Sequence, residues 1–116
     1  MLKFMKGELG KPYKWGADGP NSYDCSGFAC AALRKGGLSQ GDTTADGLYR
    51  QYKGQPISKM LDKNAAMLLF NVSGGQASHV GLAVNGVVYQ AAGGRAQKVM
   101  QSTGIGRKWT HFATVG

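Results

Sequence analysis

The residues best suited to chemistry are a cysteine at the start of a predicted helix and a histidine at the start of a predicted strand. Cys25 directly follows Asp24, a good N-cap residue, and apolar residues recur after it at helical spacing until Gly36 and Gly37. The N–H groups and dipole at a helix start favour a thiolate, so we expect a pKa for Cys25 below the usual value of about 8.5. Asp24 opposes this effect unless its side chain turns to cap the helix. The competing interpretation of Cys25 is a buried packing residue, which is what most free cysteines are.

The second cysteine fits that competing role better. Cys30 lies in the middle of the same predicted helix, inside the apolar run 28–33, with no source of positive potential beside it. The stretch of helix between the two cysteines rises by about 7.5 Å, which makes a disulfide between them unfavourable. We therefore expect two free thiols, of which Cys25 is the reactive one.

A β-hairpin is the strongest structural signal in the sequence. Asn85-Gly86 lies between two apolar runs and predicts a two-residue type I′ turn. Counting back from the turn places Gly81 opposite Gln90, and His79 on the same face of the hairpin as Gln90. The other face is almost wholly apolar and is expected to be buried: Val80, Leu82, Val84, Val87, Tyr89 and Ala91.

His79 and Gln90 are a candidate base and the residue that orients it. In this register they are diagonal neighbours roughly 7–8 Å apart at the backbone, which is within side-chain reach. A slip of one residue would put the two side chains on opposite faces. The small residues on this face would let the helix that carries Cys25 come close. Two alternatives stay open: a strand-end histidine with a solvent-facing glutamine, and His111, the other histidine of the chain, as the base.

These motifs together resemble those of the NlpC/P60 family, papain-like cysteine peptidases that cut bacterial cell-wall peptides. The similar stretches are, in chain order, Gly10-Lys-Pro-Tyr-Lys-Trp-Gly16, Gly19-Pro20, Asp24-Cys-Ser-Gly-Phe28, Thr44-Ala-Asp46, Ser78-His-Val-Gly-Leu82 and Gln90-Ala91. They span residues 10–91, most of the chain. The resemblance implies a peptidoglycan hydrolase. A phage endolysin, or its catalytic domain, is one kind of protein that fits this description.

The resemblance also implies roles for individual residues. The nucleophile, the base and the residue that orients the base would be Cys25, His79 and Gln90. Tyr13 matches a tyrosine whose hydroxyl lies beside the nucleophile and helps to hold the oxyanion. Asp24 and Ser26 match positions that line the pocket for the amino end of the stem peptide in some members. We expect no metal or other cofactor, because two cysteines and two distant histidines give no ligand spacing for zinc.

Length and patterning predict one α+β domain over all 116 residues. The resemblance implies a papain-like NlpC/P60 fold in which N-terminal helices pack on an antiparallel sheet of about five strands. The helices are expected near residues 2–9, 25–35 and 44–53. The strands are expected near 66–71, 79–84, 87–92, 97–101 and 110–115.

The chain is strongly basic, with a formal net charge of +8. Such a balance first suggests nucleic acid, but the basic residues are dispersed and no recognition motif accompanies them. A cell wall that carries teichoic acids or free carboxylates suits the charge equally well and fits the family. The charge would then produce a faster, salt-sensitive encounter with these anionic wall polymers. A merely soluble basic surface is the other interpretation.

The sequence predicts no membrane span, because its apolar runs are far shorter than the ~20 residues that a span requires. Residues 1–10 read as a short amphipathic helix without the apolar stretch and cleavage site of a signal peptide. The resemblance implies a protein that acts on the cell wall, and we expect it to be a monomer. It would reach the wall by phage-encoded release or as a domain of a larger protein.

The predicted reaction is hydrolysis of an amide bond in a peptidoglycan stem peptide through a thioester acyl-enzyme. Two other functions stay open. One is an amidase or acyltransferase of the same superfamily, which would use the same thioester chemistry on a lipid or a sugar-linked amide. The other is a catalytically silent wall-binding or phage-tail module that retains the fold.

Overall fold

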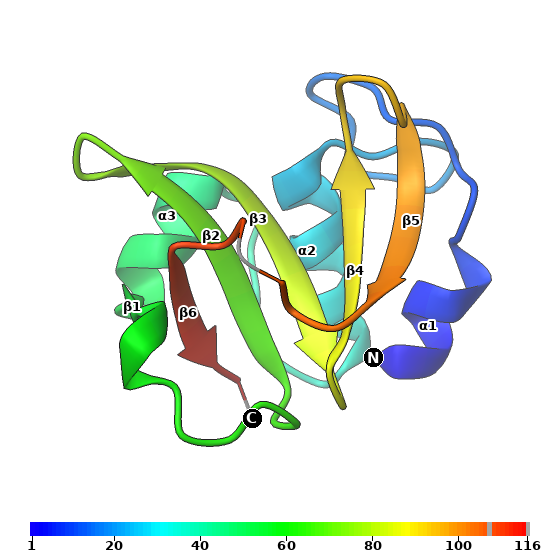
Figure 1. Cartoon of the computed structure of the whole chain (residues 1–116). Helices are drawn as coiled ribbons and strands as arrows, with labels where there is room; N and C mark the ends of the chain where they lie inside the picture. Colours follow the sequence, from blue (N-terminus) through cyan, green and yellow to red (C-terminus); the bar gives the residue numbers. More distant parts are fainter. Residues whose placement is uncertain (107, 116) are drawn as a thin grey trace.

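Helices come first along the chain and strands follow, as expected for the predicted α+β class (Figure 1). The computed structural model describes residues 1–106 and 108–115. The helices are α1 (Leu2–Gly7), α2 (Cys25–Lys35), α3 (Ala45–Gln51) and a short 3₁₀ helix, η1 (Ile57–Lys59). The strands are β1 (Gln55–Pro56), β2 (Met67–Ser73), β3 (Gln76–Val84), β4 (Val87–Ala92), β5 (Lys98–Thr103) and β6 (His111–Thr114). They form one antiparallel sheet in the order β1-β6-β2-β3-β4-β5.

The predicted helices and strands all occur, with some ends shifted by one to three residues. The sixth strand, β1, was not predicted, because it has only two residues and pairs only with β6. β3 begins earlier than expected, since Gly74 and Gly75, both with positive φ, make a tight turn that joins it to β2.

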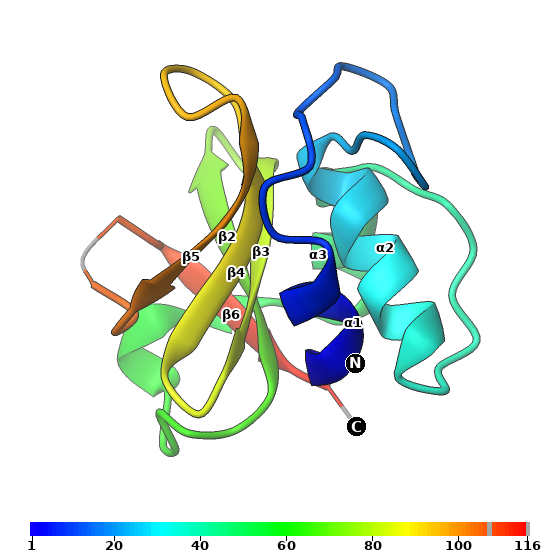
Figure 2. The same ribbon diagram turned by 90° about the vertical axis from the view of Figure 1, so that its right-hand side faces the viewer.

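The α-helices α1, α2 and α3 cover one face of the sheet, so that these helices and the sheet form two layers (Figure 2). The main core lies between these layers, where Phe28 and Ala29 of α2 pack with Val80 and Leu82 of β3. The expectation that α2 would approach the His79 face of the hairpin is therefore wrong. The large apolar side chains of the other face attract α2 more strongly, because they bury more apolar surface than the small residues do.

The opposite face of the sheet has a smaller core of its own, formed by Met67, Leu69, Ala83, Val88, Trp109 and Phe112. Residues 104–106, which follow β5, cross in front of this face (Figure 1), and Ile105 and Trp109 pack on it. Both faces of the central strands are thus covered. The consequence for the site is that His79 lies among packed side chains and not on an open strand.

The β3–β4 hairpin has the predicted register. Leu82 pairs with Tyr89 and Ala83 with Val88 across the turn at Asn85. Asn85 has a φ of 53° and the glycine after it a φ of 78°, as a type I′ turn requires. Val80 and Leu82 of β3 therefore face the helices together with Tyr89 and Ala91 of β4, and Ala83 and Val88 lie on the other face, as the sequence predicts.

β3 has one irregularity, directly before His79. Asn71 of β2 pairs with His79, but the next residue of β2 pairs with Ala77, so Ser78 is an extra residue in β3. Such a bulge changes the alternation of side chains and re-aims them locally. Ala77 and Val80 consequently both face the helices, although three positions separate them.

The first turn of α2 is fixed by a cap and by a close approach of the preceding loop. Asp24 Oδ1 accepts a hydrogen bond of 2.6 Å from the backbone N–H of Gly27, which confirms Asp24 as the N-cap. A Cβ atom at Gly27 would lie 2.3 Å from the carbonyl oxygen of Ala17. Only glycine at this position lets the loop that carries Tyr13 lie against the start of α2.

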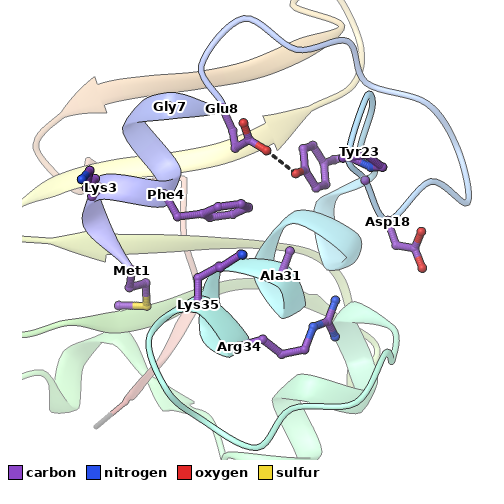
Figure 3. A pocket seen from close by; sticks show the side chains of 12 residues that line it. Met1, Lys3, Phe4, Gly7, Glu8, Asp18, Tyr23, Ala31, Arg34 and Lys35 are labelled. Atoms are coloured by element: carbon purple, nitrogen blue, oxygen red, sulfur yellow. Dashed lines mark hydrogen bonds between the residues drawn. The ribbon is translucent and has the colours of Figure 1, made fainter.

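The helix α1 is attached to α2 and to the segment before it through aromatic rings and one partly buried carboxylate (Figure 3). Glu8 accepts a hydrogen bond from the Tyr23 hydroxyl and pairs with Lys11 Nζ at 2.7 Å. Phe4 contacts the rings of Tyr23 and Phe28. A cavity of about 920 Å³ lies between α1, α2 and the 18–23 segment, and none of the six predicted site residues lines it.

Stability should depend on the charge of Glu8. Burial by itself raises the pKa of Glu8, but the hydrogen bonds from Lys11 and Tyr23 outweigh burial and hold the pKa below its usual value. A depressed pKa in the folded state stabilises the fold above the unfolded pKa of about 4.3, and this contribution is lost as the pH falls through the folded pKa. We expect Glu8→Gln to lower Tm by about 5 °C at pH 7 and to lower it much less near pH 3.

Thermal unfolding followed by circular dichroism at the two pH values measures this difference. Asp18→Asn is the matched control, because Asp18 lines the same cavity from an exposed position. An equal loss of Tm at both pH values for Glu8→Gln would contradict the electrostatic explanation.

Candidate active site

Cys25 is the first residue of α2 and lies where this helix meets β3. Its side chain is partly exposed, and it packs at the edge of the main core. The backbone N–H of Val80 faces the sulfur, together with the N–H groups of Cys25 and Ser26. Val80 directly follows His79, so the thiol contacts β3 next to the candidate base.

The pKa of the Cys25 thiol is raised above its ordinary value, which contradicts the expected lowering. Burial is the largest cause, and the negative charge of Asp24 adds to it. The N–H groups of Val80, Ser26 and Cys25 itself act in the predicted direction but are outweighed. Asp24 does cap the helix and also accepts from Gly16 N at 3.1 Å, yet these bonds do not cancel its effect on the thiol. The resting cysteine is consequently a thiol, with backbone donors placed to receive negative charge on sulfur.

His79 and Gln90 are joined by a hydrogen bond of 2.7 Å between Nε2 and Oε1. The two residues thus share one face of the sheet, as the register predicts. An amide oxygen only accepts, so this bond places the proton of a neutral imidazole on Nε2. Nδ1 is then the basic nitrogen of the ring.

The indole of Trp109 lies flat against the imidazole of His79. The ring centroids are 5.5 Å apart and the planes differ by 13°. Sequence reasoning missed this contact, because Trp109 belongs to a connecting segment with no periodic pattern. The glycine at position 81 was the available signal: it leaves space on the His79 face, and the indole occupies this space.

Tyr13 lies between Cys25 and the turn that follows β4. Burial raises the pKa of its hydroxyl, and the nearby Cys25 and Asp24 raise it further, so the hydroxyl remains protonated and able to donate. The Tyr13 ring comes within 3.6 Å of the position that a Cβ atom would take at Gly93. Gly93 in turn borders a cavity of about 650 Å³ that His79, Gln90 and Trp109 line.

Asp24 and Ser26 lie together on the other side of Cys25. Ser26 Oγ donates to Asp24 Oδ1 at 3.3 Å, and both residues line a small hollow of about 120 Å³ with Gly16 and Asp42. The hollow is polar and bears three carboxylates, those of Asp18, Asp24 and Asp42, so it is suited to a group with N–H donors and positive charge.

The structure therefore brings the six predicted residues into two groups that meet at β3. One group is His79 and Gln90, and the other is Tyr13, Asp24, Cys25 and Ser26. No hydrogen bond joins Cys25 to His79 within residues 1–106 and 108–115. Catalytic hydrogen bonds are often long in unliganded enzymes and tighten when substrate binds.

The two competing residues lie elsewhere. His111, the rival base, contacts Tyr49 edge-on at 5.4 Å and forms a 2.8 Å bond between Nδ1 and Thr110 Oγ1. Cys30 is fully buried, and its thiol donates to the Thr43 carbonyl at 3.8 Å. Both cysteines are free thiols, which confirms that expectation.

Two further observations concern the described residues only. They contain no group of three or more His, Cys, Asp or Glu side chains that could hold a metal ion. None of the helices formed by these residues has the length and apolar character that a membrane crossing demands.

Known proteins are similar to this chain over the stretch that contains the candidate site residues. The sequence model of the NlpC/P60 family matches residues 10–115. The chain is 38% identical over 81 residues to a probable endopeptidase p60 of Listeria grayi, covering 70% of this chain and 15% of that protein. It is 32% identical over 119 aligned positions to the murein DD-endopeptidase MepH of Escherichia coli K12, covering 100% of this chain and 43% of that protein. The chain thus spans less than half the length of these two relatives.

Solved structures show the same fold. The NlpC/p60 domain of the peptidoglycan hydrolase SagA has a TM-score of 0.74 at 23% identity, covering 98% of this chain and 95% of that domain. The P60 domain of an antigen from M. avium subspecies paratuberculosis has a TM-score of 0.71 at 25% identity, covering 97% of this chain and 89% of that chain. With the family match over almost all of its length and helices packed on an antiparallel sheet, the chain belongs to the NlpC/P60 family.

Proposed function

We propose that residues 1–116 form one catalytic domain that hydrolyses an amide bond in peptidoglycan stem peptides, with Cys25 as nucleophile and His79 as base. The observation that carries the proposal is the hydrogen bond between His79 of β3 and Gln90 of β4. The residue directly after His79 is Val80, and its backbone N–H faces the Cys25 sulfur. Two relatives of this chain are named as endopeptidases, one of them for murein, and this agrees with the proposed substrate.

The raised pKa of Cys25 determines how the reaction begins. A thiol is a weak nucleophile, so its proton must leave as the sulfur attacks the substrate carbonyl. His79 takes this proton on Nδ1 while Gln90 holds Nε2. The imidazole becomes an imidazolium, and the sulfur forms a bond to the carbonyl carbon.

The tetrahedral intermediate carries its negative charge on the former carbonyl oxygen. The backbone N–H of Cys25 and the protonated hydroxyl of Tyr13 are the donors available to it. When the intermediate collapses, His79 gives its proton to the leaving amine and a thioester remains on Cys25. Water then attacks the thioester with His79 as base, which releases the new carboxyl group and restores the thiol.

The polar hollow next to the nucleophile would bind the amino end of the stem peptide. Asp24 and Ser26 supply acceptors there, together with the carboxylates of Asp18 and Asp42. The net charge of +8 would add a salt-dependent attraction to anionic wall polymers and not to nucleic acid. The protein would act at the cell wall as a monomer without a cofactor.

The nucleophile is tested by comparing the two cysteines. Cys25→Ala should reduce release of peptides from purified cell walls by at least about 10³-fold, because the covalent step is lost. Cys30→Ala should keep the activity and lose only packing, since Cys30 lies in mid-helix and is buried. Mass spectrometry of the soluble products reads the bond that is cut: new amine and carboxyl ends within the stem peptide are expected.

Other outcomes of the same digest have definite meanings. Products cut between sugar and peptide would assign an amidase, and transfer to an added amine would assign an acyltransferase. An intact wall with wild-type protein would assign a silent binding module. Equal activity of Cys25→Ala and wild type would refute the nucleophile.

The base and its orienting residue are tested together. His79→Ala should reduce turnover nearly as much as Cys25→Ala, because residues that act as a unit are strongly non-additive. Gln90→Ala should cost less, on the order of 10- to 100-fold in kcat with little change in KM, since it misplaces the imidazole without removing it. Clearing of a cell-wall suspension measures both changes. His111→Ala is the control, and a larger loss there than at His79 would show that the base is misassigned.

The resting state of the thiol has its own test. Because burial raises the pKa of Cys25, the thiolate fraction at neutral pH is lower than in an unstructured peptide, and it grows as the pH rises. The rate of iodoacetamide labelling at Cys25 should therefore be slow at pH 7 and still be increasing above pH 8.5. Peptide mapping separates this rate from that of Cys30, which should label more slowly because it is buried. A labelling rate at Cys25 that is constant from pH 5 to 8 would indicate a stored thiolate.

A further inference from the structure

Trp109 lies against the proposed base, His79, and against Gly81, the neighbouring residue on the same sheet face. Its indole stacks on the His79 imidazole, with 5.5 Å between centroids. The six-membered ring of the indole also lies over Gly81, where a Cβ atom would come within 2.9 Å of Cη2 and 3.4 Å of the Gln90 Cβ. Gly81 lies opposite Gln90, so the indole covers the strand between the two hydrogen-bonded partners.

The indole is itself held in place. Trp109 is 7% exposed and packs with Ala83 and Val88, the next residues of the same sheet face, and with Phe112 of β6. A ring fixed by packing on three strands can fix the plane of another ring that lies against it. The absence of a side chain at position 81 is what allows this approach.

We propose that Trp109 is a positioning residue that holds the His79 imidazole in plane and shields one side of the His79–Gln90 hydrogen bond from water. The proposal rests on the proposed role of His79 as the base. A hydrogen bond shielded from water is electrostatically stronger than an exposed one, and it keeps Nε2 engaged while Nδ1 exchanges protons. The π face of the indole also attracts the imidazolium that forms in each half of the reaction.

Kinetics of three variants test the proposal. Trp109→Leu removes the aromatic face, and we expect kcat to fall about tenfold or more with KM nearly unchanged, because the base is misplaced and not the substrate. Trp109→Phe keeps a ring and should recover a large part of kcat. Phe112→Leu removes a comparable amount of packing from the same core without contact to His79, and should leave kcat close to the wild-type value. Equal kcat values for Trp109→Leu and Phe112→Leu would overturn the proposal.

A fluorescence titration tests the contact independently of activity and of any folding defect in Trp109→Leu. Trp15→Phe leaves Trp109 as the only tryptophan of the chain. A protonated imidazole quenches a stacked indole, so emission should increase from acid to neutral pH. Adding His79→Gln should abolish this pH dependence although His111 is still present. Emission that does not change with pH, or that changes equally in the His79→Gln protein, would overturn the stacking.

These experiments distinguish an error in the proposed function from an error in the proposed role of Trp109. If Cys25→Ala and His79→Ala digest cell walls as well as wild type does, the proposed function is wrong whatever the fluorescence shows. If both are inactive while Trp109→Leu has the kcat of Phe112→Leu, only the positioning role is wrong.

Discussion

The antiparallel register of β3 and β4 is the constraint on which the site depends. A two-residue turn with positive φ at both positions leaves one register open to the flanking strands, and this register decides which side chains share a face. His79 and Gln90 meet because they lie on one face, and Gly81 lies between them because it is on that face as well. The apolar residues of the other face then attract α2, which brings Cys25 to the middle of the same strand, beside Val80. The hairpin thus fixes the orientation of the imidazole and the location of the helix at once.

Two opposing effects act on the Cys25 thiol. A helix start offers N–H groups that favour the thiolate, but the same packing of α2 on β3 that brings the sulfur to the N–H of Val80, next to His79, also removes it from water. Burial has the larger effect, and Asp24, which is needed to cap the helix, adds a negative charge nearby. Such surroundings favour the protonated thiol, and an anion on sulfur then needs a base to accept the proton. Such an arrangement also protects the sulfur from oxidants, because the thiolate is the form that they attack.

Local patterns made most of the fold predictable. The turn at Asn85, the cap at Asp24 and the alternation along β3 and β4 depend on residues close in sequence, and each occurs as expected. The packing side of α2, the direction of the Cys25 pKa and the stack of Trp109 on His79 depend on segments that are far apart in the chain. A free helix start predicts a low thiol pKa, and only the packed sheet supplies the burial that reverses it.

The extra residue in β3 at Ser78 lets the two parts of this strand direct their side chains independently. In a regular strand Ala77 and His79 would face the same way, so burying one against the helices would turn the other toward them too. The bulge separates these demands: Ala77 faces α3, where its N–H donates to Asp46 Oδ1 at 3.0 Å, while His79 faces the opposite layer. The bulge therefore reverses, within one strand, which alternate residues face the helices. Leu69 and Phe70 of β2 pair with the part of β3 that follows the bulge, and this pairing fixes the direction of the imidazole. The side chains near the turn at Gly74 and Gly75 can therefore alternate between the two faces without regard to His79.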